Sequence, residues 1–239
     1  MKAFFWAGLL SSIFVAAQPA FDVASVRAVP NQGDDNGSPF DEKVKAHPGS
    51  VIMTNVRLHT VVKWAYDLKN YEISGTDMLA AEHYNISAKS EEGTPVAQLR
   101  TMMQTLLATR FKLQFRREAK ELRGYDLVVK DKTKLHFSGE EGEADIGGNG
   151  PVGHFKRTSM AELADVLSLI FLGAVFDKTG LDGRFDFTLA PQAYMTPGAD
   201  PIGGFMAAIE DQLGLKLQPR KAAVELFVVV HAEKVPTEN

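Results

Sequence analysis

Six basic residues have the most regular spacing among the side chains of this sequence that could take part in binding. They fall on two short segments in which apolar and charged residues alternate, as in a β-strand. The six are Lys112, Arg116, Arg117, Lys216, Arg220 and Lys221. Two positive strips of this kind could receive an acidic envelope protein or an anionic polymer. The alternative interpretation is that the charges protect a sheet edge against unwanted pairing, which is a common role of lysine on edge strands.

Two other segments match ligand-binding motifs, but their surroundings favour turns. Residues 148–153 satisfy the glycine pattern of dinucleotide-binding turns, yet an acidic stretch precedes them and a strand-like segment follows, where the motif requires a strand and then a helix. Residues 177–180 match the phosphorylated aspartate motif of P-type ion pumps, which also need magnesium-binding acids and many membrane helices. The sequence therefore predicts a linker for the first segment and a polar hairpin for the second.

Candidate metal and catalytic residues are scattered along the chain. The six histidines, at 47, 59, 83, 136, 154 and 231, show no metal-ligand spacing, and neither a His-Glu-x-x-His nor a Gly-x-Ser-x-Gly motif occurs. Acidic residues between Asp34 and Glu42 lack the complete twelve-residue calcium pattern. We therefore assign no catalytic, cofactor-binding or metal-binding residue. Serine, histidine and aspartate can still converge in space without a local motif, so an enzymatic activity stays open.

The elements that would position these residues occur twice in the same order. Apolar stripes with helical spacing run from residue 96 to 107 and from 202 to 213, at a constant offset of about 106 residues. Two earlier stripes, at 58–65 and 163–170, are related in the same way. Helix starts are indicated by Thr94-Pro95, by Asp200-Pro201, and by Ser159 and Glu162 in capping-box spacing.

Strands are expected around these helices. They are Phe21 to Val29, Tyr84 to Ala88, 111–117, 125–129, Phe185 to Leu189, 215–221 and 226–230. The sequence thus predicts an α+β fold of two tandem copies of a small β-α-β-β-α-β-β module with short mixed sheets, derived from a duplicated ancestor.

Composition and length define the expected domains. Residues 1–17 combine one lysine, an apolar stretch and a small-residue cleavage site, which is typical of a secretory signal peptide. We expect a first repeat at 18–130, an acidic, glycine-rich linker at 131–152, and a second repeat at 153–235. With no Cys, disulfides and thiolate chemistry are excluded, and a net charge of −4 argues against nucleic acid as a partner. No later segment is apolar enough for a membrane span.

The sequence also resembles a known family in several separate segments. These are Phe21–Val26, Thr54–Leu58, Ala65-Tyr66, Tyr71–Gly75, Leu107–Leu113, Asp177–Phe187 and Leu213–Leu217. Together they are similar to the soil-associated family of exported bacterial proteins, a domain of unknown function abundant in acidobacteria, over essentially the whole mature chain. The resemblance implies no catalytic residue. Some relatives are appended to membrane-bound zinc peptidases of the antibiotic-sensor type, which implies that a sensing role here would belong to a separate soluble component.

Each half has a second, weaker resemblance, to the short N-terminal signalling module of secretins and TonB-dependent receptors. That module works by protein contact in the periplasm. We therefore expect an exported, soluble, non-catalytic binding or interaction protein of the bacterial cell envelope. The alternative is an envelope hydrolase whose active site is assembled in the cleft between the two domains. An enzyme should show a deep pocket with convergent titratable groups, and a binding module a shallow groove or an open strand edge.

Overall fold

The computed structural model describes residues 18–30, 42–75, 79–80, 82–149, 152–195 and 200–236. The expected signal peptide at 1–17 lies outside the described residues. So do most of the acidic loop that was considered for calcium and two residues of the glycine pattern at 148–153. Within the described ranges, no helix combines the length and the apolar character needed to cross a membrane.

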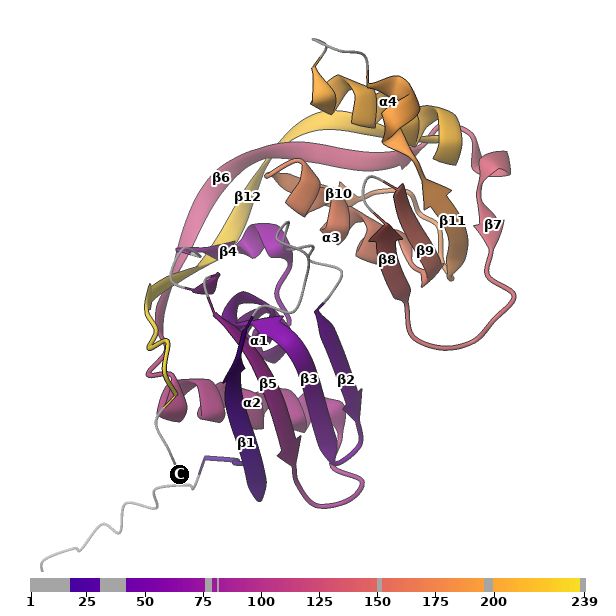
Figure 1. Ribbon diagram of the computed structural model, residues 1–239. Coiled ribbons are helices and arrows are strands. Elements are labelled where there is room, and N and C mark those ends of the chain that lie inside the picture. The colour runs from indigo at the N-terminus through magenta and orange to yellow at the C-terminus, as the bar shows by residue number, and fades with distance from the viewer. Residues whose placement is uncertain are drawn as a thin grey trace, which may run out of the picture.

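The first half, residues 18–130, contains a four-stranded antiparallel sheet and two helices (Figure 1). The strands are β1 (Val23–Val29), β2 (Lys43–His47), β3 (Ser50–Arg57) and β5 (His83–Lys89), in the spatial order β1-β5-β3-β2. The helices are α1 (Leu58–Tyr66) and α2 (Val96–Arg110), and a short 3-10 turn, η2 (Asn70–Glu72), follows α1. The expected strands around Phe21 and Tyr84 are confirmed as β1 and β5.

The second half, from residue 131 onward, has the same arrangement. Its strands are β7 (His136–Phe137), β8 (Asp145–Asn149), β9 (Val152–Thr158) and β11 (Phe185–Leu189), in the order β7-β11-β9-β8, and its helices are α3 (Met160–Ile170) and α4 (Pro201–Leu213). Element for element, this order matches that of the first half. Descent from a duplicated ancestor stays a prediction. Within 131–152, where a linker was expected, β7 and β8 are hydrogen-bonded to β11 and β9.

A long two-stranded ribbon joins the halves. β6 (Gln114–Val129) and β12 (Leu215–His231) pair antiparallel along almost their whole length. The short strands are exchanged between halves: β4 (Ile73–Ser74) pairs with β12, and β10 (Ala174–Asp177) pairs with β6, both in parallel. The sequence analysis was wrong in dividing each long strand in two, because the basic segments and the apolar closing segments are continuous β-strands.

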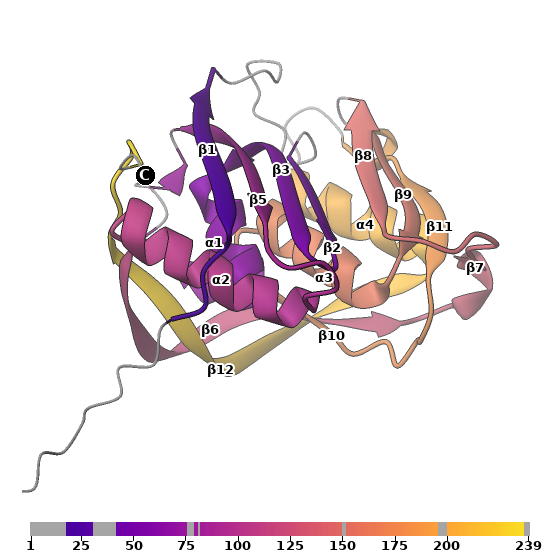
Figure 2. The ribbon, with the colours of Figure 1, turned by 90° about the horizontal axis from the view of Figure 1, so that it is seen from below.

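The helices lie between the two four-stranded sheets and the ribbon, as Figure 2 shows. Two separate hydrophobic cores result, one in each half. Phe227, Val229 and Ala232, at the end of the chain, are buried in the core of the first half. Leu127, from the last part of β6, is buried in the core of the second half. The ribbon therefore supplies each core with residues from the other half of the sequence.

Local signals account for the starts of two of the four described helices, α3 and α4. Ser159 and Glu162 form the expected capping box before α3, with Glu162 N–H donating to Ser159 Oγ at 3.2 Å and Ser159 N–H donating to Glu162 Oε2 at 2.8 Å. Asp200 caps α4 by accepting from Ile202 N–H at 3.0 Å. The expected cap at Thr94 is wrong: Pro95 occupies the N-cap position without a side-chain bond, and the Thr94 hydroxyl donates to the Glu91 carbonyl at 2.6 Å.

Candidate functional site

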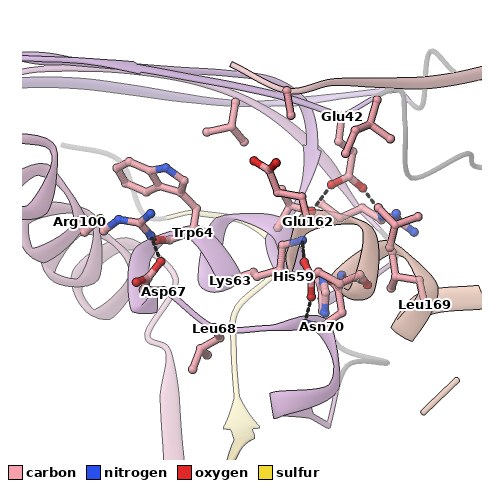
Figure 3. A pocket seen from close by; sticks show the side chains of 17 residues that line it. Glu42, His59, Lys63, Trp64, Asp67, Leu68, Asn70, Arg100, Glu162 and Leu169 are labelled. Carbon is pink, nitrogen blue, oxygen red and sulfur yellow. Dashed lines mark hydrogen bonds and ion pairs between the residues drawn. The ribbon is translucent and has the colours of Figure 1, made fainter. Parts of the chain in front are cut away.

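A cleft of about 420 Å³ lies between the halves, lined by residues of both. The first half contributes β2, α1 and η2, and the second contributes α3 and the start of β8. Figure 3 shows polar side chains from α1, among them His59 and Lys63, pointing toward those of α3. Because β2 and β8 are the outermost described strands of their sheets, the cleft is also bordered by two strands that each pair with a single described strand.

Asp165 of α3 makes the main polar contact between the halves. Its Oδ1 accepts from the Asn70 backbone N–H at 2.7 Å, and its Oδ2 accepts from Lys63 Nζ at 3.2 Å. The Asn70 side-chain amide in turn donates to the Asp165 carbonyl at 3.0 Å. One residue of the second half is thus held by both α1 and η2 of the first half. Charge-assisted bonds of this kind are stronger than neutral ones.

Glu42, just before β2, makes a second polar cluster on the first-half side of the cleft. Its side chain is only 5% exposed, and its two oxygens accept from Arg57 Nε and from the Thr60 hydroxyl. Burial of a carboxylate is tolerated when it is paired and hydrogen-bonded, and both conditions are met here.

All four carboxylates that line the cleft have a basic partner. Arg100 lies 3.1 Å from Asp67 and also stacks over the Trp64 ring, 5.1 Å from its centroid. Glu162, already engaged in the helix cap, lies 3.4 Å from Arg184. The pairs are Glu42–Arg57, Asp67–Arg100, Glu162–Arg184 and Asp165–Lys63. The charges of the cleft therefore compensate one another and hold its walls in place.

His59, on the first turn of α1, is the residue of the cleft with the most displaced pKa. Its pKa is lowered from 6.5 to about 4, mainly by burial and then by the neighbouring cations Lys63 and Arg57, against a smaller opposite effect of Asp165. The imidazole is therefore neutral at pH 7. The sequence indicated a surface or boundary position for His59; the structure places it, half-buried, at the contact between the halves.

The six basic residues predicted from the sequence lie outside the cleft. Most already have partners: Lys112 donates to the Thr109 carbonyl at 2.8 Å, while Arg116–Glu118, Arg117–Glu225, Arg220–Asp126 and Lys221–Glu121 are ion pairs. Lys216 is exposed at the start of β12. The six do not form one strip. The first three lie where the ribbon meets the first half, and Lys216 lies where it meets the second. Arg220 and Lys221 share another cavity, near the middle of the ribbon.

The cleft residues were missed by sequence reasoning. Lys63 and Asp165 are 102 positions apart and come together only because the ribbon brings the two halves side by side.

Within the described ranges, no group of three histidine or acidic residues could hold a metal ion. Thr60 lines the cleft with its hydroxyl directed at the Glu42 carboxylate, and His59 is next to it in the chain.

The fold defines an α+β protein with two topologically matching halves across a polar cleft. The family described as "Protein of unknown function (DUF3738)" matches residues 59–232, from α1 to the end of β12, and the chain belongs to this family. No curated protein matches the chain, and no solved structure does.

Proposed function

We propose that this protein is an exported, soluble, non-catalytic binding protein of the bacterial cell envelope that holds its ligand in the cleft between the halves. The apolar leader at 1–17 and the resemblance to an exported family support export. The observation that carries the binding role is that two outermost strands, β2 and β8, border the same cavity. Val44 of β2 and Ile146 of β8 both line it.

The ligand that suits this geometry is an extended polypeptide segment of an envelope protein. An outermost strand presents unpaired N–H and C=O groups, to which a peptide can add as a further strand. The paired charges of the cleft keep its two walls in place without attracting ligands of either sign strongly. A role through protein contact also agrees with the resemblance of each half to the signalling module of secretins and TonB-dependent receptors.

The absence of cysteine from the sequence provides a direct test. Ala144 lines the cleft, whereas Ala223 is exposed on the ribbon. Each is replaced by Cys, and both variants are labelled with the same bulky maleimide. Peptides selected from a random display library on the unlabelled protein should bind labelled Ala223→Cys normally and lose binding to labelled Ala144→Cys. Equal binding to both labelled proteins, or no enriched peptide at all, would contradict the proposal.

Export has its own measurement. We expect the protein expressed with its leader in a bacterial host to be recovered outside the cytoplasm with a mature N-terminus at Gln18, as determined by N-terminal sequencing. Retention of residues 1–17 on a cytoplasmic product would remove this part of the proposal and leave the peptide test unaffected.

A hydrolase is the second candidate, because Thr60, Glu42 and the neutral His59 line one cavity. Such an enzyme should turn over cell-wall fragments, and His59→Gln should abolish turnover while leaving the fold intact by circular dichroism. If the wild type turns over such fragments and His59→Gln does not, the hydrolase is favoured over the binding protein. Turnover unchanged in that variant would place the chemistry elsewhere.

A further inference from the structure

The cavity shared by Arg220 and Lys221 differs from the cleft in the composition of its walls. It measures about 510 Å³ and lies where the middle of the ribbon meets the turn between α3 and β10; we name it the ribbon pocket. Arg123, Arg220 and Lys221 line one part of it, and Tyr125, Phe171 and Leu172 line another. Among the described residues, none that lines it is acidic.

The cations of the ribbon pocket are only partly compensated. Arg220 is paired with Asp126 at 2.8 Å, and Lys221 lies 3.4 Å from Glu121. For Arg123, no ion pair is found in the described part of the chain. Arg123 and Lys221 are directly opposite each other in the β6–β12 ladder. Like charges in this position destabilise a sheet, and an anion bound between them would remove the repulsion.

The apolar part of the pocket contains an unusual leucine. Leu172 is 92% exposed and has a left-handed backbone, with φ at 47°. A left-handed backbone is strained for a residue other than glycine, and a side chain this exposed contributes almost no hydrophobic stabilisation. Beside it, the rings of Tyr125 and Phe171 are in tilted contact, with centroids 5.8 Å apart. A ligand with an apolar body would cover these groups.

A second cavity adjoins the ribbon pocket. It has a volume of about 550 Å³ and shares Arg123, Leu172 and Gly173 with the ribbon pocket. Leu226 and Ala174 line it, and both are buried. The two cavities thus share Arg123 and Leu172, and polar side chains, among them Asn70, Lys120 and Ser168, also line the second cavity. The volume of the ribbon pocket itself falls within the range of about 300 to 1,000 Å³ that is typical of small-molecule sites.

We propose that the ribbon pocket binds an amphipathic organic anion, with its anionic head between Arg123 and Lys221 and its apolar body against Leu172, Tyr125 and Phe171. The inference goes beyond the proposed function, since it concerns a different cavity and a different class of ligand. A long polyanion would contact the cations but leave the apolar wall uncovered, so its binding is a competing outcome.

The test compares probes of equal tail length by isothermal titration calorimetry with the purified protein. Dodecanoate should bind with one site at concentrations below micelle formation. Dodecyltrimethylammonium, with the same tail and the opposite charge, should bind at least tenfold more weakly. Equal affinity for the two probes overturns the proposal, because it means that the tail alone binds. Polyphosphate that binds more tightly than dodecanoate also overturns it, in favour of a polyanion site.

Variants locate the site. Arg123→Gln should weaken dodecanoate binding about tenfold, and Leu172→Asp should abolish it. Lys216→Gln is the matched control, since it removes an exposed cation of the same ribbon outside the pocket, and it should leave binding unchanged. Equal losses in Arg123→Gln and Lys216→Gln overturn the assignment. Labelled Ala144→Cys, whose cleft is blocked, should bind dodecanoate normally, so failure of the peptide proposal and failure of this one are distinguishable.

Discussion

The cleft between the halves and the ribbon pocket have similar volumes, about 420 and 510 Å³, but different charge arrangements. In the cleft each acidic side chain has a basic partner, and the bonds of Asp165 cross from one half to the other. In the ribbon pocket three cations come together without an acidic lining residue. Paired charges fix the position of the walls, whereas incompletely paired charges leave binding capacity for a ligand. Changes to the paired charges of the cleft should therefore affect stability, and changes to the cations of the ribbon pocket should affect binding of an anion.

The largest expected effect is a pH dependence that arises from His59. Its pKa is lowered to about 4 in the folded protein from 6.5, so protonation favours the unfolded state. The contribution is complete above pH 6.5 and is lost as the pH falls toward 4. Between pH 7 and pH 4.5, the free energy of unfolding of the wild type should fall by about 2 to 3 kcal/mol more than that of His59→Gln, in urea denaturation. Parallel losses in the two proteins would show that His59 is not responsible.

The next largest effect on stability is expected from removing one carboxylate near each of the two cavities. Asp165→Ala should lower the free energy of unfolding by about 2 kcal/mol, because it leaves the Asn70 N–H and Lys63 without their acceptor. Glu121→Ala removes the exposed ion-pair partner of Lys221 and should lower the free energy of unfolding by less than about 0.5 kcal/mol. The side chains of Asp165 and Glu121 are 16% and 66% exposed, which accounts for the difference. Similar costs in urea denaturation would mean that the two regions do not differ in structural role.

The smallest expected effect concerns Leu172. Leu172→Ser should change the free energy of unfolding by less than about 0.5 kcal/mol, because the side chain is 92% exposed and contributes little to the core. In differential scanning calorimetry, the variant should therefore melt within a few degrees of the wild type. A markedly lower melting temperature would indicate that Leu172 is covered in solution, and that the apolar wall of the ribbon pocket serves stability instead.

The sequence predicted the helices well because their signals are local. Ser159 and Glu162 are three residues apart, and Asp200 precedes Pro201, so their bonds depend on a few neighbouring residues. The ribbon could not be predicted in this way, because β6 and β12 pair across about a hundred residues. Gly124 and Pro219 interrupt the strand pattern of the sequence, and the structure explains how each is accommodated. A Cβ on Gly124 would lie 2.0 Å from the Ala174 carbonyl oxygen of β10. Pro219 lies in a stretch of β12 that pairs with β6 alone, where the outer edge tolerates proline.

The candidate sites were even less accessible to sequence reasoning. Arg220 and Lys221 were selected because of their charge and alternation, but Arg123 belongs to a different strand and is placed opposite Lys221 by the pairing of β6 with β12. The cleft residues Glu42, Lys63 and Asp165 stand in no shared motif. Both sites depend on the way the ribbon crosses from one half to the other, which is a property of tertiary structure.

The burial of Phe227, Val229 and Ala232 in the core of the first half has a consequence for biosynthesis. This core cannot close until residue 232 has been translated, although its helices and sheet emerge much earlier. Until then the nascent chain keeps apolar surface open, in a state that chaperones bind. If the chain is exported, as we propose, late closure of this core would help to keep the chain unfolded enough to pass through a translocation channel. Folding would then be completed after translocation.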